Sequence, residues 1–403
     1  MSTQANVAAS PAVAEQAAAV RVTAKHMRIA AIDVMRGLVM LLMLIDHVRE
    51  TIYVHLQVSD PMNVVTTAPS LFFTRLTAHV CAPTFVFLTG LSAWLYAHPA
   101  SGPERSPRAF LVKRGLLIIL LEWTLVSFAW TGELSPLRIY LQVMWIIGLS
   151  MIALAIAAHL PRWLIAVLGF LIVFGHNTLT SIHFAPGESG YMLWTTLYEK
   201  GYLIAPGGPI MIKVSYPLLP WIGVILLGYA AGPLYSRTIS SDERSKLLVA
   251  LGAGCLLLLL ILRGFNIYGE TLPWVHGADA VHTLMSWVNF TKYPPSLDFL
   301  LLTLGFAFLL LSRFEFVDNK ATQTLALFGG APMFFYLLHL YVLLLLQNVA
   351  VAVLGANHGN RFGVDNVAWI WLTAAALAIA LYWPCQAFAR FKRRTHYAWV
   401  KYF

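Results

Sequence analysis

The sequence contains 403 residues, of which 59% are hydrophobic and only 11% are charged, and its mean hydropathy is +0.71. These values exclude an ordinary water-soluble globular protein, in which about a quarter of the residues are charged, and they indicate an integral membrane protein. The net charge of +9 does not indicate nucleic-acid binding, because the basic residues are dispersed along the chain.

Residues 1–26 are rich in Ala, Val, Ser and Gln and lack the continuous apolar stretch of a signal peptide. We therefore expect a disordered cytoplasmic tail, followed by one transmembrane domain over residues 27–403. The three cysteines, Cys81, Cys255 and Cys385, are far apart and show no CxxC spacing. This pattern predicts neither a disulfide framework nor a thiolate metal site, and we assign no metal ligands.

Apolar runs bounded by Pro, Gly and charged residues predict an all-α, polytopic helix bundle with about ten transmembrane helices. About 20 apolar residues suffice to cross a hydrocarbon core of roughly 30 Å. The predicted spans cover residues 28–50, 71–97, 109–131, 137–159, 161–176, 216–236, 245–263, 297–313, 325–354 and 366–389.

The distribution of basic residues predicts that both termini are cytoplasmic. With this orientation, 18 of the 27 Lys and Arg residues fall in cytoplasmic segments, as the positive-inside rule requires. Residues 177–215 and 264–296 then form two long outer loops, rich in Gly, Pro, Tyr and Trp. Such loops suit the binding of a sugar or another polar acceptor, although an interfacial aromatic belt has a similar composition.

The first span carries Asp33, Arg36, Asp46 and His47, and a charge at the bilayer centre costs roughly 2.5–3.5 kcal/mol. Arg36 and His47 lie on one helix face about 16 Å apart. Asp33 and Arg36 have the i, i+3 spacing of an ion pair, and a ligand's anionic group is the alternative partner for Arg36. His47 suits a general base or a proton relay, with Asp46 as its candidate orienting group.

Two further histidines in predicted spans, His79 and His339, each lie near a proline in the sequence. Pro83 cannot donate a hydrogen bond to the carbonyl of His79, so we expect a polar pocket there that His47 shares, or a simple kink. Pro332 is expected to free a backbone acceptor in the same way before His339, whose ring Tyr336 could orient.

The third span begins with Lys113 and Arg114 and reaches Glu122 eight residues further on. The basic pair suits the phosphates of a cytosolic nucleotide cofactor as well as an ordinary positive-inside anchor. Glu122 needs a cation or several hydrogen-bond donors if it is ionised, and otherwise it is an acid able to donate a proton.

Several blocks along the chain resemble one known group of proteins. They are "RIAAIDVMRGLVMLLMLIDHVRE", "FFTRLTAHVCAPTFVFLTG", "YPLLPWIGVILLGYAAG", "KYPPSLDFLLLTLGFAF" and "LFGGAPMFFYLLHLYV". In this order they are similar to blocks of bacterial membrane proteins grouped with the heparan-alpha-glucosaminide N-acetyltransferase catalytic domain. The first block, RG followed after nine residues by His, also resembles integral membrane acyltransferases that O-acetylate surface glycans.

The resemblance implies acyl transfer across the bacterial inner membrane. Acetyl-CoA would dock from the cytoplasm as acyl donor, and the acceptor would be an amine or hydroxyl of a glycan or similar molecule at the outer face. His47 corresponds to the first-helix histidine of the acyltransferases and Arg36 to the arginine of their RG pair. His55 is a candidate counterpart of the loop histidine of the lysosomal glucosaminide enzyme.

Residues and resemblance together give one predicted site. His47 is the base and Asp46 its orienter, His79 or His339 supplies an oxyanion donor or proton, and Glu122 is a further acid. The cofactor-binding residues are predicted to be Arg36, Lys113 and Arg114. Direct transfer and an acetyl-histidine intermediate both stay open, as does a homodimer. The alternatives are a proton-coupled transporter or flippase with these groups as a relay, and a scaffold without chemistry.

Overall fold

The computed structural model describes residues 11–133, 137–395, 397 and 400, and it confirms a mostly helical membrane protein. Among these residues, six helical stretches are long and apolar enough to cross a membrane. They are Pro69–Ala97, Arg162–Leu179, Ser241–Gly264, Leu297–Phe314, Pro332–Leu354 and Ala368–Arg394. The chain is therefore a multi-pass protein in contact with lipid, while the ten spans and the cytoplasmic termini stay predictions.

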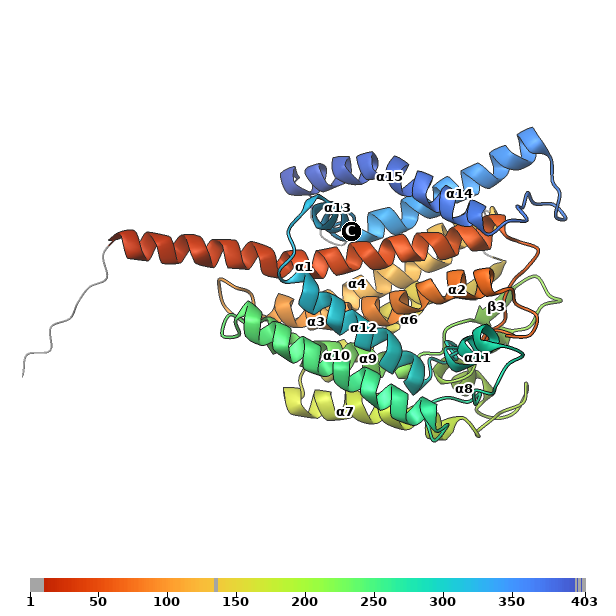
Figure 1. Cartoon of the computed structure of the whole chain (residues 1–403), viewed down its shortest axis with the longest axis horizontal. Helices are drawn as coiled ribbons and strands as arrows, with labels where there is room; N and C mark the ends of the chain where they lie inside the picture. The colour runs from red at the N-terminus through yellow and green to blue at the C-terminus, as the bar shows by residue number, and fades with distance from the viewer. Residues whose placement is uncertain (1–10, 134–136, 396, 398–399, 401–403) are drawn as a thin grey trace, which may run out of the picture.

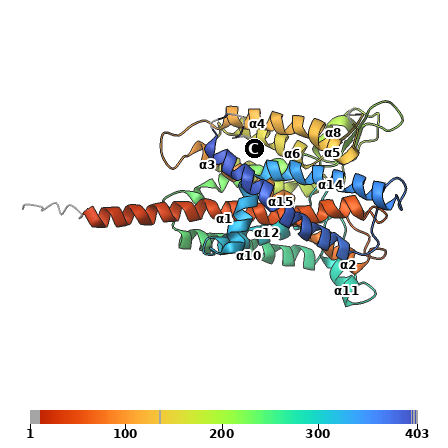
Figure 2. The same ribbon diagram turned by 90° about the horizontal axis from the view of Figure 1, so that it is seen from above.

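Helix α1, Pro11–Ile52, runs through the middle of the bundle (Figures 1 and 2). Helices α13, α14 and α15 pack against it, as do α3 and α12. Residues 11–26, which we expected in a disordered tail, form the beginning of this helix, and their Ala-rich composition suits a helix. Residues 1–10 of the expected tail lie outside the described part of the chain.

The other helices follow α1 along the chain. The long or bundle-forming helices are α2 (Pro69–Thr77), α3 (Cys81–Ala97), α4 (Arg108–Leu121), α5 (Ser127–Thr131), α6 (Val143–Ala157), α7 (Arg162–Gly175), α9 (Leu219–Ala230), α10 (Ser241–Gly264), α12 (Leu297–Phe314), α13 (Lys320–Gly329), α14 (Pro332–Leu354) and α15 (Ala368–Arg394). Short helical turns are η1 (Ala78–Val80), η2 (Glu122–Val126), η3 (His176–Leu179) and η4 (Gly232–Tyr235), of which η2 is a π-helix.

Two predicted spans differ from the observed elements. The span predicted at residues 137–159 begins with strand β1 (Arg138–Leu141), whose backbone pairs with β3 (Met211–Val214), so helix α6 begins only at Val143. The span predicted at 325–354 is two helices, α13 and α14. Pro332 opens α14 at its first turn, where a missing N–H breaks no helical bond.

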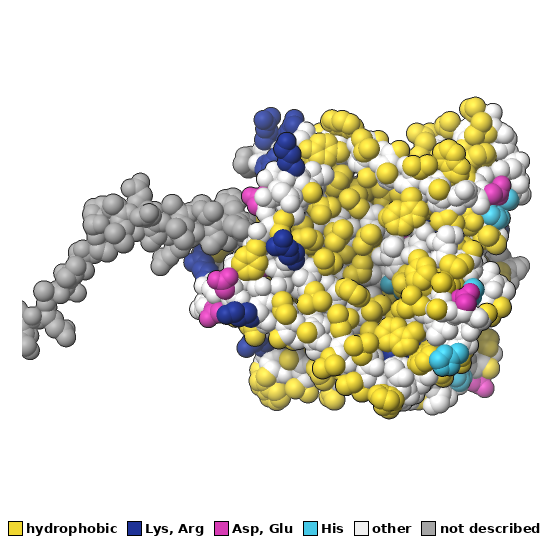
Figure 3. Space-filling model, viewed as in Figure 1, with side chains coloured by type: hydrophobic (Ala, Val, Ile, Leu, Met, Phe, Trp, Pro, Cys, Tyr) yellow, Lys and Arg dark blue, Asp and Glu magenta, His cyan; other side chains and the backbone are white. Residues whose placement is uncertain are grey.

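The expected outer loops gather at one end of the bundle, which we call the loop end (right in Figure 1). They contain α8 (Tyr191–Leu197), α11 (Ala280–Trp287), β2 (Gly201–Ile204) and β3. The strand order is β1-β3-β2, with β1 parallel and β2 antiparallel to β3. At the opposite end, which we call the basic end, Lys and Arg side chains gather on the face that Figure 3 shows.

Asp60 ties the loop after α1 to the segment that precedes α12. Its carboxylate accepts the backbone N–H groups of Lys292 at 3.1 Å and of Tyr293 at 2.9 Å. Burial raises the pKa of the Asp60 carboxyl, against the opposing positive charges of Arg75 and Lys200. Two segments more than 200 residues apart are thereby joined at the loop end.

Helices α3 and α9 approach so closely that their backbones touch at glycines. A Cβ at Gly228 would lie 2.1 Å from the Phe87 carbonyl oxygen, and one at Gly90 would lie 2.0 Å from the Ile225 carbonyl oxygen. Small residues allow this kind of contact between membrane helices, where packing rather than hydrophobic burial drives association.

We expect Gly228→Ala to lower the free energy of unfolding by about 1–3 kcal/mol, because the added methyl group forces α3 and α9 apart. The apparent melting temperature in detergent measures this loss. Gly254→Ala is the matched control, since a methyl group at Gly254 in α10 would meet no side chain or neighbouring helix within 4 Å. Equal melting temperatures for the two variants would contradict the tight α3–α9 contact.

Candidate functional site

The rings of His47 on α1 and His339 on α14 form the centre of the candidate site. Nδ1 of His47 lies 2.7 Å from Nε2 of His339, and the rings are nearly parallel, with centroids 5.0 Å apart. Nδ1 of His339 lies 2.8 Å from the carbonyl oxygen of Phe335. The sequence offered His79 or His339 to act with His47, with a pocket shared by His47 and His79, and the structure brings His47 together with His339, 292 residues away.

The hydrogen-bond partners determine which nitrogen of each neutral ring carries the proton. The Phe335 carbonyl can only accept, so Nδ1 of His339 must donate to it and Nε2 of His339 must accept. Nδ1 of His47 then donates to that nitrogen, which leaves the lone pair on Nε2 of His47. Among the described residues Nε2 of His47 has no hydrogen-bond partner, so this nitrogen is free to accept a proton.

Two aromatic side chains pack edge-on against His47. Trp130 of α5 has its ring centroid 5.2 Å away and Tyr336 of α14 has its centroid 6.0 Å away. The indole Nε1–H of Trp130 is buried and has no hydrogen-bond partner among the described residues. An unpaired buried donor beside a candidate base is a group that a substrate oxygen can satisfy.

Asp46 does not orient His47, contrary to the prediction. Its Oδ1 accepts from Arg49 at 2.9 Å and its Oδ2 from Arg75 at 2.7 Å, and all three side chains are buried. A carboxylate turned about 100° away from its neighbour along the helix reaches a different set of partners. Arg75 of α2 was not singled out in the sequence, because nothing local connects it with Asp46.

Two cavities lie near the histidine pair, although neither His47 nor His339 is among the residues that line them. The basic cavity has a volume of about 330 Å³ and extends from Arg36, Arg114 and Lys392 to Tyr336. The loop-end cavity has a volume of about 200 Å³, and Thr51, Trp130 and Leu340 are among its lining residues.

The position of His47 on α1 relates the two cavities to each other. Met43, one turn before His47, lines the basic cavity, and Thr51, one turn after it, lines the loop-end cavity. The two aromatic neighbours of His47 also line different cavities: Tyr336 lines the basic cavity and Trp130 lines the loop-end cavity. The histidine pair therefore lies between residues that line the basic cavity and residues that line the loop-end cavity.

Three cations lie on the wall of the basic cavity. Arg36 pairs with Asp33 at 2.9 Å, which confirms the expected i, i+3 pair, and it also donates to Ser92 at 2.5 Å. Arg114 lines the cavity, but its neighbour Lys113 points outward and is exposed. Lys392 of α15 is the third cation and was missed, because its run of basic residues looked like an ordinary membrane anchor.

Glu122 and His79 line neither cavity. The Glu122 carboxylate accepts the backbone N–H of Met144 at 3.0 Å, at the N-terminus of α6, where unpaired amides and the helix dipole favour an anion. His79 packs on Phe299 with centroids 5.2 Å apart, and its Nδ1 has no partner among the described residues. The contact with α6 accounts for Glu122, whereas His79 lies in the packed core with one ring nitrogen unpaired among the described residues.

His55, the candidate counterpart of a catalytic loop histidine, lies outside the histidine pair. It stacks on His358 at the loop end, with ring centroids 4.5 Å apart. It lines neither of the two cavities.

A comparison with protein families gives one match. The family model described as "Heparan-alpha-glucosaminide N-acetyltransferase, catalytic" matches residues 28–268, a stretch that contains Arg36, His47 and Arg114. No curated protein matches the chain.

Replacement of Asp46 tests whether the buried ion network stabilises the fold. We expect Asp46→Asn to cost about 3–5 kcal/mol of stability, since it removes the carboxylate that two buried arginines share and leaves Arg75 without an ion pair among the described residues, while Arg49 keeps Glu50 at 3.1 Å. Thermal unfolding in detergent measures the loss. The control is Glu104→Gln, which removes an exposed carboxylate 3.8 Å from His98 and should leave the melting temperature unchanged. An unchanged melting temperature for Asp46→Asn would show that the ion network does not stabilise the fold.

Proposed function

Because the chain belongs to the heparan-alpha-glucosaminide N-acetyltransferase catalytic family, we propose that it transfers an acetyl group from acetyl-CoA to a polar acceptor across the membrane. The acceptor is an amine or hydroxyl of a glycan or a similar molecule. The observation that carries this proposal is the position of the His47–His339 pair between a basic cavity and a polar cavity.

The basic cavity fits an acyl-CoA. Its three cations, Arg36, Arg114 and Lys392, suit phosphate groups, while its inner walls are mostly apolar, as the pantetheine arm and the thioester require. Arg36 and His47 are about 16 Å apart along α1, a length that an extended pantetheine arm matches. The positive-inside rule puts this basic end in the cytoplasm, where acetyl-CoA is available.

His47 acts as the general base in this proposal. Its Nε2 takes the proton from the acceptor amine or hydroxyl as that atom attacks the thioester carbonyl carbon. The carbon–sulfur bond then breaks, and the proton on His47 passes to the departing CoA sulfur. His339 holds the reacting tautomer by accepting from Nδ1 of His47, and so it is a positioning residue.

Trp130 supplies a donor for the oxyanion that forms during the attack. Its buried indole N–H is unpaired among the described residues, its ring packs against His47, and the residue lines the loop-end cavity on the acceptor side. A donor already fixed in a water-poor site stabilises developing charge without reorganisation. His339 does not serve this role, because both of its ring nitrogens are engaged.

The described arrangement favours transfer over ion or proton transport. A relay needs titratable groups along a continuous path, but Asp46 is held by two arginines and Glu122 caps a helix. His79 packs against Phe299 away from both cavities. The remaining pair, His47 and His339, lies between residues that line the basic cavity and residues that line the loop-end cavity, which supports a group-transfer site.

Replacement of His47 tests the base. We expect His47→Gln to lower acetyl transfer at least about 100-fold, the usual contribution of a general base, and to leave CoA affinity within twofold. Transfer of radiolabelled acetyl to a panel of amino sugars and glycans, with calorimetry for CoA, measures both quantities. His159→Gln, at an exposed position, is the control. Full activity of His47→Gln would eliminate His47 as the base.

Replacement of two adjacent basic residues, Arg114 and Lys113, tests whether CoA binds in the basic cavity or responds only to the total positive charge. We expect Arg114→Gln to raise the Kd for CoA about tenfold, equivalent to about 1.4 kcal/mol, because it removes a cation from the cavity wall. Lys113→Gln removes the same charge from the exposed face of α4 and should change the Kd less than twofold. Equal effects of the two substitutions on calorimetric CoA binding would refute the assignment of this cavity.

A further inference from the structure

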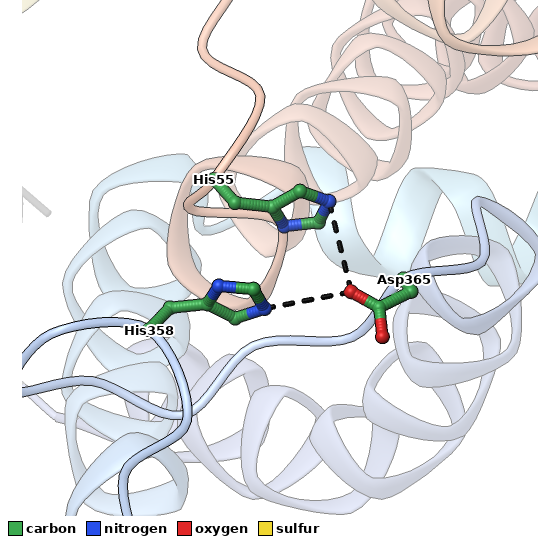
Figure 4. Close-up of side chains that lie close together, drawn as sticks. All are labelled: His55, His358 and Asp365. Carbon is green, nitrogen blue, oxygen red and sulfur yellow. Dashed lines mark ion pairs between the residues drawn. The ribbon is translucent and has the colours of Figure 1, made fainter.

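Three potential metal ligands meet at the loop end, outside the site described above. They are His55, from the segment after α1, and His358 and Asp365, from the segment between α14 and α15 (Figure 4). One potential ligand atom of each residue lies within 4.8 Å of those of the other two. The two segments are about 300 residues apart in sequence, so only the fold brings them together.

The distances among these atoms suit ligands around a common ion. Nε2 of His55 lies 3.8 Å from Oδ1 of Asp365, and Nε2 of His358 lies 3.4 Å from the same oxygen. Neither approach is a hydrogen bond of ordinary length. Ligands at about 2.1 Å from a tetrahedral zinc ion are about 3.4 Å from one another, close to the observed separations.

The two histidine rings are also aligned as ligands would be. They stack with an interplanar angle of 12°, and both direct Nε2 toward the Asp365 carboxylate (Figure 4). Two imidazoles and one carboxylate are a donor set that suits zinc-type cations.

Local contacts hold His358 and the backbone of its segment in place before any ion binds. His358 and Arg361 exchange backbone hydrogen bonds of 3.0 and 3.1 Å. A Cβ at Gly363 would lie 2.5 Å from Cδ2 of His358, so the glycine lets the ring pack directly on the backbone. Val364 donates to the carbonyl of Ile52 at 2.8 Å, which joins this segment to the end of α1. A fixed set of ligands lowers the entropic cost of binding an ion.

We propose that His55, His358 and Asp365 bind one divalent transition-metal ion of the zinc type, with water in the fourth position. The ion would join the outer end of α1 to the segment between α14 and α15. Asn360 and Arg361 of that segment line the loop-end cavity, so the ion fixes the rim of this cavity. The site does not depend on the acetyl-transfer proposal.

Zinc binding by the full-length protein tests the site directly. Purified, tag-free protein in detergent is stripped with EDTA, saturated with zinc chloride and exchanged into metal-free buffer, and its zinc is measured by mass spectrometry. We expect one equivalent per chain. Cobalt(II) in place of zinc should give the visible absorption of a four-coordinate site, and calorimetry gives the Kd for each ion.

Three ligand variants and one control make the test specific. His358→Ala, Asp365→Ala and His55→Ala should each weaken zinc binding at least about 100-fold, since loss of a ligand costs no less than loss of its supporting partner. His282→Ala is the control, because His282 also contacts an aspartate, Asp279 at 2.9 Å, but has no second histidine among its partners.

The results separate a built site from adventitious binding. Zinc retained equally by His358→Ala and the unaltered protein would overturn the proposal, as would the absence of bound zinc after saturation. A melting temperature in EDTA that matches the unaltered protein shows that each variant is folded. His358 and Asp365 have no part in the proposed transfer chemistry, so loss of zinc binding in their variants is distinguishable from failure of that chemistry.

Discussion

Hydrocarbon offers no hydrogen bonds, so each charged group inside the bundle needs a partner supplied by the protein itself. Helix α1 shows how this constraint organises the structure. Asp33 is paired by Arg36, and Asp46 is paired by Arg49 and Arg75. The Arg75 contact joins α1 to α2 and the His47–His339 contact joins it to α14, so polar pairs link α1 to two of the helices around it.

The same constraint explains why His47 differs from its charged neighbours. A neutral imidazole needs no counter-charge, so it can lie at depth with one nitrogen bonded and the other free. The bonded nitrogen faces His339, whose own second nitrogen is bonded to the Phe335 carbonyl. This series of hydrogen bonds runs in one direction, from the Phe335 carbonyl through both rings to the free lone pair on Nε2 of His47. It keeps a reactive nitrogen available where a carboxylate would have to be neutralised by a cation.

Local sequence patterns predicted the positions of most helices and the Asp33–Arg36 pair, because both depend on residues within a few turns. They also selected His47 and Arg36 as residues on one face of α1. They could not predict that His47 meets His339 or that Asp46 meets Arg75, since such pairs depend on how distant helices pack. Lys113 and Arg114 are adjacent and chemically alike, and only the rotation of α4 about its axis separates the exposed one from the cavity-lining one.

Pro332 was predicted to lie inside one long helix, and its position at the start of α14 changes the description of the site. Inside a single long helix it would leave a carbonyl unpaired, but the chain breaks before it, and Ala331 donates to the Phe328 carbonyl at 3.3 Å. The break brings Gly329, Gly330 and Pro332 to the wall of the basic cavity. Lys392 donates to the Gly330 carbonyl at 3.1 Å, so the freed backbone acceptor holds one of the cavity's cations. The interruption of the helix thus positions a cation on the wall of the basic cavity, and α14 can begin in the register that turns Tyr336 and His339 toward His47.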